Sequence, residues 1–328
     1  MLKKNKLTER KIIDIIVNLQ DKMKNNPLPF GDDVAAIRIG KGQLAVMKCD
    51  MLVAKTDIPK GMNLWQTSRK AVISVISDLA AKGVQPMGIL ISLGMPRKIS
   101  ENYVRQIGRG MNAAAREYGT HVIGGDTNES TDLTIDVSAF GICKERELIR
   151  RDTAKVGDIV MVTGAFGLPA LGLKIIKKKM EISKKLKEKA IKAVFMPKAR
   201  LSEGLTLAKN HLINSSIDSS DGLAWSLYEL SKSSNIGFQI NRIPIHREVR
   251  EFAIKNDLDL IDLAFYGGEE YELVITQKPT LYKKTKKKIR TLIPIGHVTE
   301  NSGKIILKLK NKYRDLEPRG FEHHSNNV

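Results

Sequence analysis

Apolar residues recur with two different periods along the chain, and the two periods alternate. Between Leu133 and Ala139 they fall at every second position, as in a half-buried β-strand, whereas Val72, Val75 and Leu79 share the spacing of one helix face. The same patterns predict helices at 8–23, 65–82 and 101–118 and strands at 43–48, 87–93, 121–123 and 133–139. The first half is therefore predicted to be a mixed α/β unit.

A second α/β unit follows a turn-rich, charged crossing at 145–158. We predict Lys-rich helices over 168–194, a helix that ends near 211, a loop at 215–221, a further helix, and strands at 159–162, 237–243, 271–276 and 293–299. Because 328 residues suit two domains, we place one domain at 1–150 and the other at 151–328.

The chain has 55 Lys and Arg against 36 Asp and Glu, and this net charge of +19 raises the hypothesis of a nucleic-acid-binding protein. Most of the excess is local, because 174–192 holds nine lysines and two glutamates and 283–290 holds six basic residues without an acid. Both segments keep an apolar stripe and almost no aromatic residues, whereas single-strand binding uses aromatic rings between the basic groups. We interpret them as solvated faces of amphipathic helices and expect no nucleic-acid partner.

The cysteines and the N-terminal residues bear on the compartment. Cys49 and Cys143 form neither a disulfide framework nor a zinc ribbon, which favours a reducing compartment. The first residues are charged but lack the apolar run of a signal peptide. The longest weakly charged stretch, 87–95, is far shorter than the roughly 20 apolar residues that cross a bilayer. We expect a cytoplasmic protein without a membrane partner.

Aspartates recur beside Gly or Ser, in turns, at the ends of predicted strands and on one predicted helix. They occur in five stretches: Gly31-Asp32-Asp33, Cys49-Asp50, Ser77-Asp78, Gly124-Gly125-Asp126 and Asp218-Ser219-Ser220-Asp221. One such Asp is usually a turn or cap residue. Five stretches together favour a Mg²⁺-polyphosphate site, because Mg²⁺ binds carboxylates, water and phosphate oxygens, and glycine lets backbone approach phosphates.

The common nucleotide-binding motifs are absent. No GxxxxGK[ST] phosphate loop occurs, and the protein-kinase motifs are missing. Residues 108–113 match a dinucleotide fingerprint only inside a predicted helix with no strand before it, so we discount that match. The histidines form neither a metalloprotease motif nor a nucleophile triad, and no catalytic residue is assigned.

Six tags occur in the order seen in thiamine-monophosphate kinases, and the chain resembles that family nearly end to end. The tags are Gly31-Asp32-Asp33-Val34-Ala35, Cys49-Asp50-Met51-Leu52-Val53, 77–83, Gly124-Gly125-Asp126-Thr127, Ser220-Asp221-Gly222-Leu223 and 267–273. Together they are specific for the wider superfamily that includes aminoimidazole ribonucleotide synthetase. The resemblance implies a two-domain α/β fold with mixed sheets, whose N-terminal sheets form a barrel across a homodimer.

The resemblance also implies ATP as co-substrate and several Mg²⁺ ions near the junction of domains and subunits. It carries site roles to individual residues. The implied metal ligands are Asp33, Asp50, Asp78, Asp126, Asp218 and Asp221. The implied nucleotide contacts are Gly125, Asp126, Arg151 and Ser220. For the acceptor, Glu269 matches a substrate contact and Phe321 lies where an aromatic residue packs on the thiamine moiety.

The chain departs from the family pattern at three places. Lys48-Cys49 stands where relatives have two hydroxyl residues, so one metal ligand is missing and a lysine stands in the metal region. Asp57 matches a substrate-binding histidine, and Glu270 replaces an aspartate. The number of metal ions therefore stays open.

The resemblance implies direct transfer of the ATP γ-phosphoryl group to the phosphate of thiamine monophosphate. Because a phosphomonoester is mostly ionised at neutral pH, with a second pKa of about 6, the reaction needs no strong general base. Two alternatives stay open. One is an enzyme of the same superfamily with another acceptor, as in aminoimidazole ribonucleotide synthetase. The other, less favoured, is a basic nucleic-acid-binding protein.

Overall fold

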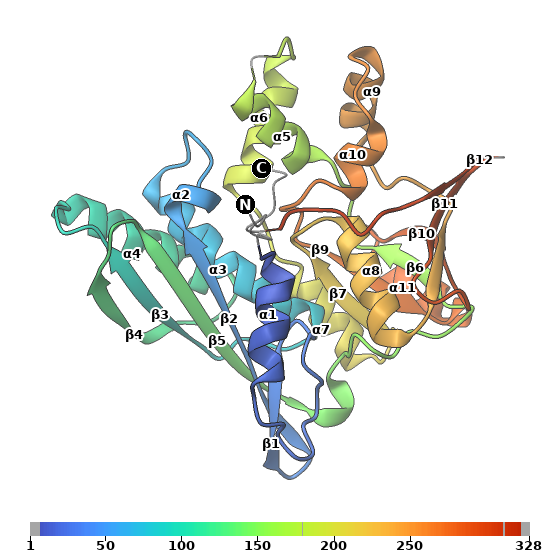
Figure 1. Ribbon diagram of the computed structural model, residues 1–328, viewed down its shortest axis with the longest axis horizontal. Coiled ribbons are helices and arrows are strands. Elements are labelled where there is room, and N and C mark those ends of the chain that lie inside the picture. The colour runs from blue at the N-terminus through green and yellow to red at the C-terminus, as the bar shows by residue number, and fades with distance from the viewer. Residues whose placement is uncertain (1–6, 179, 311, 323–328) are drawn as a thin grey trace, which may run out of the picture.

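The computed structural model describes residues 7–178, 180–310 and 312–322, and it has two β-sheets, each combined with helices (Figure 1). The first half contains α1 (Glu9–Asn18), β1 (Ala35–Gly40), β2 (Gln43–Val53), α2 (Ala54–Asp57), α3 (Leu64–Ala81), β3 (Gly88–Met95), α4 (Glu101–Glu117), β4 (Val122–Glu129) and β5 (Thr134–Lys144). Its strands form a mixed sheet in the order β1-β2-β5-β3-β4. The predicted mixed α/β architecture is thus confirmed.

The second half follows a short 3-10 turn at Glu145–Glu147. It contains β6 (Ile159–Val162), α5 (Leu168–Lys177), α6 (Lys184–Phe195), α7 (Leu201–Lys209), β7 (Ser215–Ser219), α8 (Leu223–Ser234), β8 (Gly237–Ile240), α9 (Arg247–Lys255), α10 (Leu260–Phe265), β9 (Glu272–Gln277), α11 (Tyr282–Lys288), β10 (Ile293–Thr299), β11 (Ile305–Leu309) and β12 (Lys312–Asp315). The sheet order is β12-β11-β8-β10-β6-β9-β7. No helix of the described ranges is both long and apolar enough to cross a membrane.

Helix α3 lies at the centre of the molecule. It begins with a capping box, in which the Asn63 side chain accepts from the Gln66 backbone and the Gln66 side chain accepts from the Asn63 backbone. It ends where Gly83 adopts a left-handed φ of 67°, and the Val84 amide donates to the Leu79 carbonyl. Of its 18 residues 14 are buried, because the first sheet covers one side and α7 and β7 of the second half cover another.

The other face of the first sheet carries exposed apolar side chains. Cross-strand pairing puts Met47 opposite Phe140 and Met51 opposite Asp136, and Leu90 lies on the same face. Exposed apolar residues of this open face include Ile37, Met47, Met51, Leu90 and Ile142. Within one chain the sheet does not close into a barrel.

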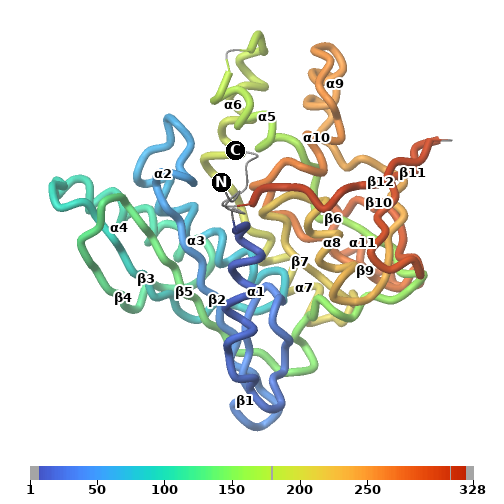
Figure 2. Tube along the Cα trace, in the orientation of Figure 1, coloured from blue at the N-terminus to red at the C-terminus, as the bar shows by residue number. Residues whose placement is uncertain are grey.

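The start and the end of the described chain meet between the two halves (Figure 2). The Arg10 guanidinium lies 3.5 Å above the Trp225 ring and pairs with Glu229. The Arg10 amide donates to Glu322 Oε1 at 3.5 Å. Helix α1 ends at Asn18 and not at 23 as predicted, because it has no buried residue and so no core contact holds a further turn.

Three predicted boundaries that concern the site are wrong. Strand β2 continues through Cys49 and Asp50 to Val53, because its partner β5 is equally long. Strand β4 continues through Gly124-Gly125-Asp126, which the sequence placed in a turn, and a Cβ on Gly125 would lie 1.9 Å from the Ile91 carbonyl oxygen. Residues 215–219 form the buried strand β7 and not a loop.

Strands β1, β11 and β12 were not predicted, whereas the strands predicted at 159–162 and 293–299 are observed as β6 and β10. The first Lys-rich segment does form an amphipathic helix: α6 buries Leu186, Ala190 and Val194, and its lysines lie outside that stripe. The second segment forms the short helix α11, but the predicted apolar residues Ile289 and Leu292 follow the helix and are not part of it. The division at residue 150 stays a prediction.

Candidate active site

A cavity of about 820 Å³ is lined by residues of both halves. It brings together most of the predicted site residues, which come from β2, α2, α3, β7 and the C-terminal segment. Those that line it are Asp50, Asp57, Asp78, Asp218, Ser220, Asp221, Glu269 and Phe321. A smaller cavity of about 250 Å³, between 146 and 214, contains none of them. The large cavity is therefore the candidate active site.

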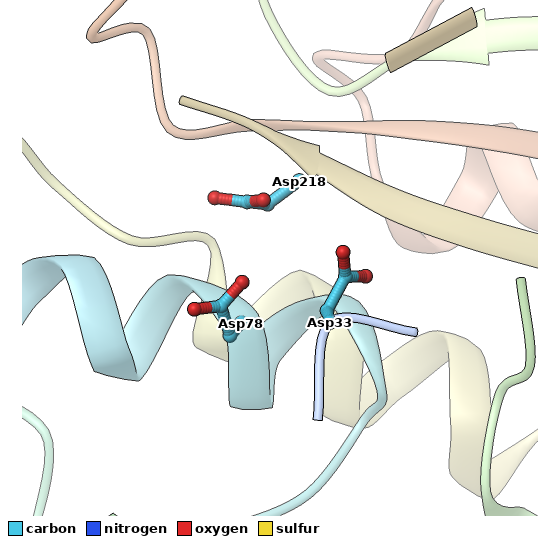
Figure 3. Close-up of side chains that lie close together, drawn as sticks. All are labelled: Asp33, Asp78 and Asp218. Carbon is cyan, nitrogen blue, oxygen red and sulfur yellow. The ribbon is translucent and has the colours of Figure 1, made fainter. Parts of the chain in front are cut away.

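Three buried carboxylates meet beside this cavity, and we call Asp33, Asp78 and Asp218 the acidic cluster. Asp78 and Asp218 line the cavity, whereas Asp33 does not. Figure 3 shows that they come from three separate segments and point toward one another. Each offers a carboxylate oxygen, and these oxygens lie within 4.8 Å of one another. Asp33 follows a turn in which Gly31 has a φ of +94°, Asp78 lies on α3, and Asp218 lies on β7. The sequence thus correctly predicted that these three aspartates converge.

The carboxylates of the cluster are not equivalent. Burial raises the pKa of Asp218 to about 7, and the negative charge of Asp33 raises it further. A hydrogen bond from Ser77 Oγ at 2.8 Å has the opposite effect on this pKa. Burial also raises the pKa of Asp78 well above its ordinary value, against the opposing charge of Lys48. The pKa of Asp33 is lowered, because Arg151 and Lys82 outweigh the effect of burial. Without a bound metal ion, Asp218 is therefore about half-protonated near pH 7.

Lys48 lies beside the acidic cluster in the cavity wall. Its Nζ is 3.0 Å from Asp78 Oδ2 and 3.9 Å from Asp50 Oδ1. The neighbouring carboxylates raise the pKa of this ammonium although burial opposes it. Strand β2 places Lys48 and Asp50 on the face covered by α3, since both alternate with the exposed Met47 and Met51. A resident positive charge therefore contacts two of the predicted metal ligands.

A second set of charged groups holds Asp33, and sequence reasoning missed most of it. Lys82 has no exposed surface and lies 2.6 Å from Asp32 Oδ1 and 2.7 Å from Asp33 Oδ2. Arg151 pairs with Asp33 Oδ1, donates to the Gly31 carbonyl, and lies 3.6 Å from Glu229. Lys82 follows Asp78 by one helical turn, but it pairs with Asp32 and Asp33 of another segment, so its spacing gave no signal for this contact. Arg151, predicted to contact nucleotide, contacts protein groups and does not line the cavity.

The segment 267–271 forms another wall. Glu269 and Tyr271 both have left-handed backbone, with φ of 68° and 54°, and their amides donate to Ser220 and Ser219 carbonyls at 2.6 and 2.9 Å. Such strain in non-glycine residues is concentrated at functional sites. Glu269 Oε1 is 2.5 Å from Lys70 Nζ, and its Oε2 is buried without a hydrogen bond.

The remaining predicted residues differ in their placement. The Asp57 carboxylate accepts from the Val53 amide at 2.7 Å and also borders the cavity. The Phe321 amide donates to the Asp221 carbonyl at 3.0 Å, which holds the aromatic ring at the cavity. Glu270 is half-buried, accepts from the Gly167 amide at 2.5 Å and does not line the cavity.

Asp126 and Gly125 do not reach the cavity in the single chain. Cross-strand pairing aligns Asp126 with Ser92, then Asp136 and Met51, so it lies on the open face of the first sheet. Asp50 is aligned with the buried Val137, which lies on the opposite face. The sequence predicted one shared site, but the fold separates Asp126 from the acidic cluster by the thickness of the sheet.

Two family models match the chain. Residues 31–143 match the AIR synthase related protein, N-terminal domain, and residues 155–308 match the AIR synthase related protein, C-terminal domain. The thiamine-monophosphate kinase of Nitrosopumilus maritimus is 37% identical over 323 residues, which cover 97% of this chain and 99% of the relative. The chain belongs to the thiamine-monophosphate kinase family of AIR synthase related proteins. The Pyrococcus horikoshii kinase is also 37% identical and covers 97% of the chain.

Solved structures agree with this assignment. The structure described as "AaThiL complexed with AMPPCP and TMP" has a TM-score of 0.85 and 26% identity, and the match covers 98% of this chain and 99% of that chain. The thiamine monophosphate kinase from Aquifex aeolicus has a TM-score of 0.76 at 25% identity, with 92% of this chain and 97% of that chain covered. The two-domain AIR synthase-related fold predicted from the sequence is therefore confirmed, apart from the barrel and the dimer.

Proposed function

We propose that the protein transfers the γ-phosphoryl group of ATP to the phosphate of thiamine monophosphate, giving ADP and thiamine diphosphate. The bond from the γ-phosphorus to its bridging oxygen breaks, and an oxygen of the acceptor phosphate forms the new bond. The observation that carries the proposal is a cavity with an acidic cluster beside it, in a chain similar over almost its whole length to thiamine-monophosphate kinases. The neighbour described with AMPPCP and TMP supports the same pair of substrates.

We propose that several Mg²⁺ ions bind as the cofactor and that the acidic cluster holds one of them. Three buried oxygen donors lie within 4.8 Å of one another, and burial raises the pKa values of Asp78 and Asp218 although the positive charge of Lys48 opposes this. Asp33, Asp78 and Asp218 would hold the ion, with Asp50 and Asp221 as further ligands from the cavity wall. When bound, Mg²⁺ supplies the charge that offsets the repulsion between two phosphate groups.

The chain's own cations would bind and orient the phosphates. Four lysines line the cavity, namely Lys48, Lys60, Lys70 and Lys177. The acceptor phosphate is a nucleophile without deprotonation by a side chain, because its second pKa is about 6. Catalysis then depends on alignment and on charge, which is the usual basis of phosphoryl transfer. We propose that Ser220, in the turn between β7 and α8, contacts the nucleotide. We propose that Arg151 supports the nucleotide site indirectly, because it pairs with Asp33.

We propose that the acceptor, thiamine monophosphate, binds at the part of the cavity wall formed by Asp57, Glu269 and Phe321. The exposed ring of Phe321 offers an apolar face for an aromatic heterocycle. The unbonded Oε2 of Glu269 offers an acceptor for an amino group or a cationic ring. Lys70 orients Glu269 through a 2.5 Å contact between its Nζ and Glu269 Oε1.

We further propose a cytoplasmic homodimer in which two copies join through the open faces of their first sheets, as a barrel. The exposed apolar row Ile37, Met47, Met51, Leu90 and Ile142 supports an interface there. Gly125 and Asp126 belong to the same sheet region, and Asp126 lies on the open face. The dimer would bring Asp126 to the site of the partner subunit.

A turnover screen tests the function. The protein is incubated with ATP and Mg²⁺ and with thiamine monophosphate, thiamine or an aminoimidazole-pathway substrate, and ADP and phosphorylated product are measured together. We expect equal amounts of ADP and thiamine diphosphate with thiamine monophosphate alone. Product from another acceptor only would reassign the substrate within the same superfamily, and no product from any acceptor would refute the phosphotransferase assignment.

Subunit mixing tests the shared site. Asp126→Asn and Asp221→Asn are each expected to lose most activity. If each site uses Asp126 of one subunit and Asp221 of the other, mixed dimers regain about a quarter of the wild-type rate, because one site in two is intact in half of the dimers. Mixtures that stay inactive would place both aspartates in one subunit's site.

A further inference from the structure

Lys82 is a fully buried cation at the C-terminal end of α3. Its ammonium lies 2.6 Å from Asp32 Oδ1 and 2.7 Å from Asp33 Oδ2, and it donates to the Ser216 carbonyl at 2.9 Å. The Ser216 carbonyl accepts a hydrogen bond from this ammonium, and the two carboxylates form ion pairs with it. Lys82 does not line the cavity, and neither does its partner Asp33.

The three contacts of Lys82 join the three segments that supply the acidic cluster. Asp33 is contacted directly, in the turn before β1. Asp78 lies one turn earlier on the same helix as Lys82. Ser216 lies on β7, two residues before Asp218, so its carbonyl ties this strand of the second half to α3.

We propose that Lys82 is a positioning residue for the divalent-cation site, which it assembles by fixing the turn of Asp33 and strand β7 against α3. This inference rests on the proposed function, because it concerns the cation that the acidic cluster would hold. Lys82 acts through Asp33 and the Ser216 carbonyl and does not contact the substrate.

Stability alone is a poor reason for this arrangement. A fully buried ion pair is often no more stabilising than apolar residues of the same volume, because each charge loses its hydration. Asp33 has a cation at each oxygen, Lys82 at Oδ2 and Arg151 at Oδ1, which fixes the orientation of its carboxylate. Each carboxylate oxygen can accept more than one contact, so Asp33 can still bind a metal ion. Partners that orient a metal ligand typically change metal affinity 10- to 100-fold when removed.

The test is binding of Mn²⁺ to the nucleotide-free protein, followed by the electron paramagnetic resonance signal of free Mn²⁺. The main variant is Lys82→Met/Asp32→Asn, which removes the ammonium together with one carboxylate so that no unpaired charge is added. Lys82→Gln is the second variant, in case the double variant folds poorly, and near-ultraviolet circular dichroism establishes the folded fraction of each. Asp32→Asn alone serves as a control, because it leaves the contact between Lys82 and Asp33.

Arg69→Met is the matched control for a structural effect. Arg69 is a buried cation on the same helix. One of its terminal nitrogens donates to the Pro197 carbonyl of the second half at 2.8 Å, and the other lies 2.7 Å from Glu117 of α4. It has no contact with the acidic cluster among its described bonds. A loss of stability alone should therefore affect both variants but change Mn²⁺ affinity in neither.

We expect both Lys82 variants to bind Mn²⁺ at least about tenfold more weakly than the wild type. Asp32→Asn and Arg69→Met should bind as the wild type does. The Mg²⁺ concentration for half-maximal turnover should rise in the Lys82 variants more than kcat falls. Wild-type affinity in a folded Lys82 variant would overturn the proposal.

Asp218→Asn separates the two possible failures. If it abolishes Mn²⁺ binding while the Lys82 variants bind normally, the metal site stands and only the role of Lys82 is refuted. If Asp218→Asn binds Mn²⁺ as tightly as the wild type, the acidic cluster is not the metal site, and the proposed function loses its cation site together with the role of Lys82.

Discussion

Asp218→Asn should stabilise the metal-free protein while it removes activity. Burial raises the pKa of Asp218 to about 7, against an ordinary value of 3.8. Since one pKa unit corresponds to about 1.4 kcal/mol, the ionised carboxylate costs roughly 4 kcal/mol of folding free energy above pH 7. The folded-state pKa is raised, so this cost is absent below pH 4, grows as the pH rises to 7 and is constant above it. An asparagine of the same shape never ionises and avoids the cost.

The assay is urea unfolding of the wild type and Asp218→Asn at pH 5 and pH 8, with a chelator present. The gain in free energy of unfolding is expected to be larger at pH 8 than at pH 5, by about 2–3 kcal/mol. Adding Mg²⁺ at pH 8 should stabilise the wild type and not the variant. If Asp218→Asn is less stable than the wild type at pH 8 without divalent ions, then Asp218 is a stabilising structural residue and the electrostatic reasoning is wrong.

Three further perturbations address other parts of the structure. Lys48→Met removes an ammonium that contacts two proposed metal ligands, so it should tighten Mn²⁺ binding, measured by calorimetry, by roughly tenfold, about 1.4 kcal/mol. Weaker binding would contradict the idea that the Lys48 ammonium competes with the metal ion for these carboxylates. Met47→Asp places a charge on the open sheet face and should give monomers in analytical ultracentrifugation, whereas an unchanged dimer would exclude this face as the interface. Gly204→Ala would put a Cβ 1.9 Å from the Ala80 carbonyl oxygen and should lower the free energy of unfolding by about 1–3 kcal/mol; an unchanged urea midpoint would show that α7 can move away from α3.

The sequence predicted well those elements whose pattern matches their burial. Strand 159–162 and the central helix α3 were clear because apolar residues recur at buried positions with the period of each element, as Val72, Val75 and Leu79 do in α3. Strand β7 was missed because its serines and aspartate are polar although the strand is buried; Ser215 Oγ, for example, lies 2.8 Å from Thr276 Oγ1. Local propensity cannot predict such a strand, since the partners that satisfy its polar groups come from distant residues.

For the site, the family resemblance predicted six aspartates as metal ligands, of which three form the acidic cluster, but it did not predict how their charges are balanced. Lys82 looks like an ordinary helix-end lysine in the sequence, and only the fold places it between Asp32 and Asp33. Asp126 shares its motif type with the cluster, but strand alternation puts it on the other face of the sheet. Which face a strand residue occupies depends on register, which tertiary packing decides.

The most direct test of the central claim is a single-turnover reaction of excess protein with ATP labelled at the γ-phosphorus, in the presence of Mg²⁺ and thiamine monophosphate. We expect the label to appear in the terminal phosphate of thiamine diphosphate, with one equivalent of ADP, and we expect no transfer when Asp218 is replaced by Asn. Label in inorganic phosphate alone, or unimpaired transfer by Asp218→Asn, would contradict the claim that the acidic cluster supports direct phosphoryl transfer to thiamine monophosphate.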